Sequence, residues 1–61
     1  MKEEEEIGKW VLNKHTDEEY EVIGFDAKNR VYVLRNDGNR ETRWSVKLYY
    51  QHFHTRTHLS Q

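Results

Sequence analysis

Apolar and polar residues alternate along the middle of the chain, and a glycine interrupts the pattern. Tyr20 and Val22 are predicted to face inward on a strand, with Glu19 and Glu21 facing outward. Ile23 and Phe25 are also apolar but stand out of phase with the first pair. Since a glycine at such a break is typical of a β-bulge or a sharp bend, Gly24 is expected to let a short sheet curl.

A second alternating stretch predicts a hairpin. The strand Arg30–Arg35 is rich in Val and Tyr, the residues most typical of β-structure. The sequence Asn-Asp-Gly-Asn follows at residues 36–39, and Gly38 is expected to supply the positive φ that a tight turn requires. Beyond the turn, inward positions alternate with polar ones in a second strand: Thr42, Trp44, Val46 and Leu48.

The N-terminal half supplies one further strand and a loop. Residues Ile7–Leu12 are strand-like and place Trp10 and Leu12 on one face. Residues Asn13–Glu19 contain no apolar side chain and predict a solvated loop.

The C-terminal segment is consistent with two structures. Four residues recur at i, i+3, i+4 and i+7, which predicts one or two helical turns: Val46, Tyr49, Tyr50 and Phe53. Beyond them, the chain is expected to form either a fifth strand or a loose tail. In the strand, Phe53, Thr55, Thr57 and Leu59 would face one way.

Short strands, a glycine bend, a tight hairpin and then Lys-Leu-Tyr-Tyr-Gln-His-Phe at residues 47–53 resemble the SH3-like or Tudor-like small β-barrel superfamily. The resemblance covers most of residues 7–59 and is one of pattern, without a diagnostic motif. It implies a mostly all-β fold, an SH3-like barrel of four to five strongly bent antiparallel strands with one short helical turn near the C-terminus. It also implies binding of peptides, of modified side chains in aromatic cages, or of nucleic acid.

The 61-residue length allows one domain, with three expected parts. Residues 1–6 are expected to be a disordered acidic arm, residues 7–53 the barrel, and residues 54–61 a closing strand or a flexible His-rich tail. The chain has no Cys, so no disulfide can supplement a small core. It has no apolar run of about 18 residues and an acidic N-terminus, so we expect a cytoplasmic protein without a membrane partner.

Charge is unevenly distributed although the net charge is only −1. Residues 1–26 hold nine acidic residues and three lysines, which makes that half −6. Residues 27–61 hold seven basic and two acidic residues, which makes that half +5. Either acidic strands pair beside basic ones, or a basic face is directed at an acidic partner.

The C-terminal histidines suggest a metal only at first sight. His54 and His58 have the His-x3-His spacing that ends a C2H2 zinc finger, but the two cysteines that such a finger needs are absent. Arg56 stands between them, and its positive charge opposes metal binding. No set of nucleophile, base and orienting group is evident either. We therefore expect no metal, no cofactor and no enzymatic activity.

Aromatic and basic residues are the remaining candidates for function. We expect a small non-enzymatic module that binds a protein, as a regulator or inhibitor of a larger cytosolic complex. Its predicted partner-binding residues are Arg30, Tyr32, Arg35, Arg43 and Tyr50. The alternative is a nucleic-acid-binding barrel that uses the basic C-terminal half: Arg30, Arg35, Arg40, Arg43, Lys47 and Arg56.

Overall fold

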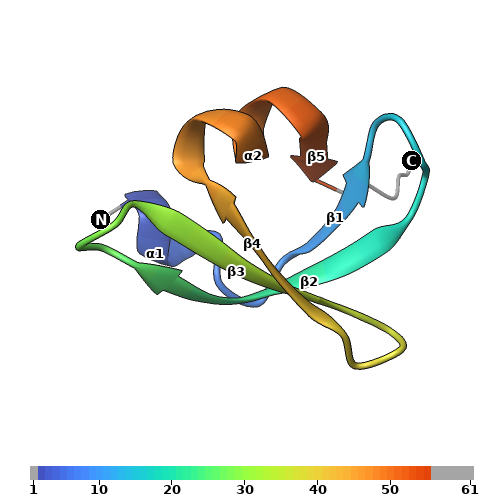
Figure 1. Cartoon of the computed structure of the whole chain (residues 1–61), viewed down its shortest axis with the longest axis horizontal. Coiled ribbons are helices and arrows are strands. Elements are labelled where there is room, and N and C mark those ends of the chain that lie inside the picture. Colours follow the sequence, from blue (N-terminus) through green and yellow to red (C-terminus); the bar gives the residue numbers. More distant parts are fainter. Residues whose placement is uncertain (1, 56–61) are drawn as a thin grey trace.

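A computed structural model describes residues 2–55 and shows a mostly β protein (Figure 1). One antiparallel sheet of five strands carries the fold, and a short helix near the C-terminus precedes the last strand. This confirms the predicted fold class. In chain order the elements are α1 (Lys2–Glu5), β1 (Trp10–Asn13), β2 (Glu19–Asp26), β3 (Val31–Asn36), β4 (Glu41–Ser45), α2 (Val46–His52) and β5 (Phe53–Thr55).

The strands follow one another across the sheet except at the last connection. The order is β4-β3-β2-β1-β5, so β1 to β4 form a meander of antiparallel neighbours. Figure 1 shows the chain passing through α2 from the end of β4 to β5, which lies beside β1. The helix therefore joins the two edge strands of the sheet and covers its inner side.

The inner face of the sheet carries the core. Tyr20 and Val22 of β2 face inward as the alternation predicts. On β1 the inward residues are Val11 and Asn13, so Trp10 and Leu12 share the outer face. The buried hydrophobic residues lie on β1, β2, β3 and β5 and on α2: Val11, Tyr20, Val22, Tyr32, Leu34, Tyr49 and Phe53.

The break at Gly24 is a β-bulge. The pairing of β2 with β3 shifts register between Val22 and Gly24, which leaves Ile23 as the extra residue. Beyond the bulge, Phe25 pairs with Tyr32 and packs against the core. The bulge thus restores an apolar residue to the inner face, which confirms the predicted bend.

The second strand of the hairpin is shorter than its alternation predicts. Strand β4 ends at Ser45, whose side-chain Oγ accepts a hydrogen bond from Leu48 N at 3.3 Å and caps α2. Within the helix Tyr49 is buried, whereas Leu48 is 43% exposed. The prediction that Leu48 faces inward was wrong. Because the cap starts a helix at Val46, side chains return to the same face every 3.6 residues from there on, and no longer every second residue.

The acidic N-terminal segment, which the sequence predicts to be a disordered arm, forms a short helix followed by a turn in the structure. Residues Lys2–Glu5 form α1, and Gly8 turns the chain with φ +95°. The Gly8 N–H donates to Val22 O at 2.8 Å. Glu6 Oε1 accepts a hydrogen bond from the hydroxyl of buried Tyr49 at 2.8 Å. A buried hydroxyl needs a partner, and this need holds the acidic segment against the core.

The β3–β4 turn differs in detail from the prediction. The residue with positive φ is Asn39, at +66°, and not Gly38. Asn39 N donates to Asn36 O at 3.0 Å, and Arg40 N donates to Asn36 Oδ1 at 2.9 Å. These bonds form a three-residue loop, in which the left-handed position falls one residue later than in a two-residue turn. Asparagine occupies that position because it tolerates left-handed backbone.

The stability of variants at Asn39 should therefore show that this residue has left-handed backbone. We expect Asn39→Val to lower the free energy of unfolding by about 1–2 kcal/mol, because a β-branched residue is strained there. Asn39→Gly should stay within about 0.5 kcal/mol of the wild type. Gly38 does not have a positive φ, so Gly38→Ala should cost less than Asn39→Val even though its added Cβ would lie close to Asn36 Oδ1, at 3.3 Å. Urea denaturation of the variants measures all three, and a larger loss from Gly38→Ala would contradict this turn.

The tyrosine hydroxyls should make stability sensitive to alkaline pH. Burial, followed by the hydrogen bond to Glu6, raises the pKa of Tyr49 well above its usual value. Burial and the bond to Glu18 also raise the pKa of Tyr20. The folded state holds these protons more tightly than the unfolded state does. The contribution of the tyrosines to the free energy of unfolding should therefore be fully present below about pH 10 and should decrease as pH rises further. The expected slope is at most about 1.4 kcal/mol per pH unit for each tyrosine.

Denaturation midpoints between pH 8 and pH 11 test this expectation. Tyr49→Phe should be less stable at pH 8 because Glu6 loses its donor, by about 1 kcal/mol. The same variant should lose less stability on going to pH 11. An unchanged alkaline loss in Tyr49→Phe would show that this hydroxyl is not responsible.

Candidate functional site

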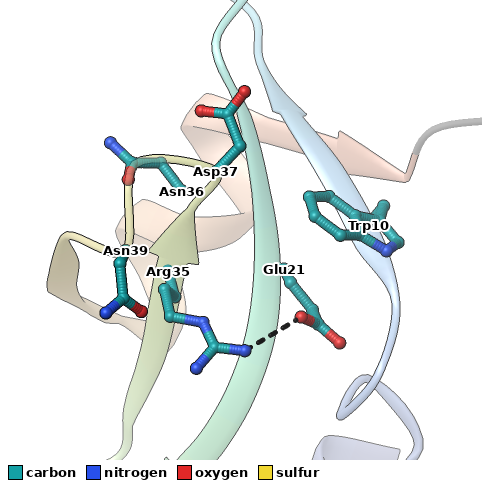
Figure 2. A pocket seen from close by; sticks show the side chains of 6 residues that line it. All are labelled: Trp10, Glu21, Arg35, Asn36, Asp37 and Asn39. Atoms are coloured by element: carbon teal, nitrogen blue, oxygen red, sulfur yellow. Dashed lines mark hydrogen bonds and ion pairs between the residues drawn. The ribbon is translucent and has the colours of Figure 1, made fainter.

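The outer face of the sheet carries a row of large side chains across four strands. Cross-strand pairing places Trp10 of β1 opposite Glu21 of β2, Glu21 opposite Arg35 of β3, and Arg35 opposite Glu41 of β4. Directly paired residues on one face lie close enough to contact one another. Figure 2 shows Glu21 between Trp10 and Arg35, with the guanidinium directed toward the carboxylate. The row alternates an aromatic ring with charges of opposite sign.

An ion pair holds the middle of this row. Arg35 Nη2 lies 3.5 Å from Glu21 Oε1, and both side chains are partly exposed. At a solvated surface such a pair contributes about 0–1 kcal/mol. Its main effect is to orient the Arg35 side chain toward β2.

A hollow opens beside this row where the β3–β4 loop projects past the sheet. It encloses about 470 Å³ and is lined by Trp10, Glu21, Arg35, Asn36, Asp37 and Asn39. The Trp10 side chain is 40% exposed at its wall. The loop residues supply amide and carboxylate groups, so the hollow combines one large apolar surface with several hydrogen-bonding groups.

A second hollow of about 300 Å³ shares two residues with the first. Its lining consists of Asp17, Glu18, Glu19, Asn36 and Asp37. The β1–β2 loop presents these acids because Asn13 Oδ1 accepts hydrogen bonds from His15 N at 2.8 Å and Thr16 N at 3.2 Å. Asp17 follows with φ +63° and turns the chain toward β2. The two hollows therefore adjoin at the tip of the β3–β4 loop.

The residues predicted to bind a protein partner do not lie together. Tyr32 is fully buried, so its ring belongs to the core and cannot be displayed on the surface. Tyr50 is 51% exposed on α2, and its hydroxyl lies 3.2 Å from that of Tyr32. Arg30 lies in the β2–β3 turn and Arg43 on the outer face of β4. Arg35 is the member of the predicted set that lines the first hollow.

The basic residues of the nucleic-acid alternative are also distributed over several elements. Arg30 lies in the β2–β3 turn, Arg40 in the β3–β4 loop and Lys47 on α2. Arg35 is paired with Glu21. Arg56 lies outside the described residues.

Histidines gather near the start of β5, where they contact aromatic rings. The ring centroid of His52 lies 5.0 Å from that of His15 and 5.5 Å from that of Trp44. His54 is exposed on β5, and His58 falls outside the described residues. Among residues 2–55 no three side chains of the metal-ligating types are grouped so that they could hold a metal ion. In the same range no helix has the length and apolarity to cross a membrane.

Sequence reasoning missed the acidic side of this site and the role of Trp10. The pattern put Trp10 and Leu12 on one face, but alternation alone does not say which face packs on the core. The acids at 17–19 stood in the predicted solvated loop and Glu21 in the predicted strand, and nothing in the chain indicated that residues 36–39 would fold beside them. Comparison with known protein families, with curated proteins and with solved structures finds no match for this chain.

The sign of the electrostatic potential around Trp10 can be measured by quenching its fluorescence with charged ions. Trp44 packs against Phe53 at a ring-centroid distance of 4.9 Å and is less exposed, so Trp44→Phe leaves Trp10 as the reporter. Because carboxylates outnumber Arg35 around the two hollows, we expect caesium ions to quench Trp10 more efficiently than iodide, relative to free N-acetyltryptophanamide. Asp37→Asn should reduce the difference. A preference for iodide would show that the Arg35 charge dominates at the ring.

Proposed function

We propose that this chain is a small non-enzymatic binding module that docks a protein partner on the outer face of its sheet. The observation that supports it is the Trp10 ring, which is 40% exposed at the wall of a hollow of about 470 Å³. Large aromatic rings set among hydrogen-bonding groups dominate the energy of protein interfaces. By occupying a surface of a larger complex, such a module would regulate or inhibit it.

The strand connectivity supports the SH3-like part of the proposal. A four-stranded meander, then α2, then β5 paired with β1 is the arrangement implied by a small barrel of that superfamily. Folds of this kind are commonly used for binding, although the fold does not determine the ligand. The choice of a protein ligand therefore rests on the Trp10 site.

A capture experiment with matched variants tests the proposal. The full chain, Trp10→Ala and Leu48→Ala are immobilised and exposed to a nuclease-treated lysate of the organism that carries the gene. Leu48 is the control because it is 43% exposed but lies on α2, away from the hollow. A protein retained by the wild type and by Leu48→Ala should be lost with Trp10→Ala. If Trp10 is a hot spot, affinity should fall by about 2 kcal/mol, or roughly 30-fold.

Two results would contradict the proposal. Retention of the same protein by Trp10→Ala, with unchanged affinity, would exclude the outer face as the docking surface. Material that is captured only without nuclease, and that is released steeply with rising salt, would support the nucleic-acid alternative instead. Circular dichroism of each variant establishes that it is folded before either result is interpreted.

A further inference from the structure

The hollow beside Trp10 and the acidic hollow next to it form one surface with a marked charge. They share Asn36 and Asp37 and so adjoin without an intervening residue. One guanidinium, that of Arg35, lines them. Five carboxylates line them, those of Asp17, Glu18, Glu19, Glu21 and Asp37, which makes the combined lining −4. A surface with this excess attracts a cationic partner and repels an anionic one.

Two of these carboxylates, those of Asp17 and Asp37, form no ion pair with another described residue. Glu21 is paired with Arg35 at 3.5 Å. Glu18 accepts hydrogen bonds from Tyr20 and Thr16, which are neutral donors. Arg40 of the β3–β4 loop lines neither hollow, but it acts electrostatically on Tyr20, whose hydroxyl donates to Glu18, so it offsets part of the negative charge at Glu18.

The arrangement of the site favours a flexible organic cation over a metal ion. Among the described residues there is no group of three His, Cys, Asp or Glu side chains that could hold a metal. An exposed indole next to carboxylates suits a Lys or Arg side chain, because the aliphatic stem can lie on the ring while the charged end reaches the acids. Trp10 and the acids thus match two parts of the same side chain.

We propose that the partner of this surface is a polypeptide segment rich in Lys or Arg, with a basic side chain against Trp10 and others along the acids of the β1–β2 and β3–β4 loops. The proposal rests on the docking site proposed above and specifies its ligand. It reverses the polarity of one of the two alternatives that the sequence left open, in which a basic face of this chain would meet an acidic partner.

Peptides of opposite charge provide the direct test. The full ¹⁵N-labelled chain is titrated with a capped (Gly-Arg)₄ peptide and, separately, with a capped (Gly-Glu)₄ peptide. The arginine peptide should shift the indole N–H signal of Trp10 and the amide signals of the two loops. The glutamate peptide should leave those signals in place. Raising the salt concentration from 50 to 300 mM should weaken the arginine complex, because surface charges are then more strongly screened.

Charge-neutralising variants separate electrostatic recognition from folding. Asp17→Asn suits the test because asparagine tolerates the φ of +63° at this position. Asp37→Asn removes a charge from an exposed loop residue that lines both hollows. Each substitution should weaken the arginine complex about two- to fivefold, and the double variant should weaken it further. Glu5→Gln is the matched control, since it removes one exposed charge from α1 and should not alter the affinity.

The outcomes distinguish this proposal from the more general one. Binding of the arginine peptide at other residues, preference for the glutamate peptide, or equal affinity of the double variant and Glu5→Gln would each overturn the cationic partner. If a cellular protein were nevertheless retained in a Trp10-dependent manner, the docking site would stand and its ligand would be of another chemistry. Loss of Trp10 dependence in the capture experiment would overturn both.

Discussion

The hydroxyl groups of the tyrosines are the constraint on which this fold depends. A chain of 61 residues without cysteine must build its core from large side chains, and Tyr20, Tyr32 and Tyr49 are buried in it. Each hydroxyl needs a partner, because an unsatisfied polar group inside a protein costs about 1–3 kcal/mol. The Tyr49 hydroxyl donates to Glu6, and that of Tyr32 is bonded to Tyr50. These two bonds connect Glu6, which follows α1, and the sheet to α2, so the position of the acidic N-terminal segment against the core follows from the composition of the core.

The bulge at Gly24 and the cap at Ser45 bring the rings of this core together. Beyond the bulge, the Phe25 ring lies 4.9 Å from that of Tyr32 between their centroids. The cap starts α2, which places the Tyr49 ring centroid 4.2 Å from that of Tyr32. Contacts between aromatic rings contribute about 0.5–1.5 kcal/mol each beyond the burial of area. The inner face is filled by them, and Trp10 is left on the outer face.

The proposed binding surface follows from this division of the sheet. Because β1 turns Val11 and Asn13 inward, Trp10 lies opposite Glu21 on the outer side, and the ion pair of Glu21 with Arg35 extends the row. Two loops that are distant in sequence then meet at the tip of the β3–β4 hairpin and concentrate negative charge there. The chain is nearly neutral overall, but its surface has an acidic end, and a partner would respond to that local field rather than to the net charge.

The sequence by itself determined the local elements of this protein. Alternation identified the inward Tyr20 and Val22, the glycine break located the bulge, and the spacing from Val46 to Phe53 indicated α2. These features depend on neighbours in the chain, so they can be read from it. Tertiary structure decided which face of β1 is buried, that Tyr32 is internal, and that Asn39 takes the left-handed position. It also decided the candidate site, because the proximity of Asp17 to Asp37 and of Trp10 to Arg35 arises from strand pairing and loop geometry, which no local pattern encodes.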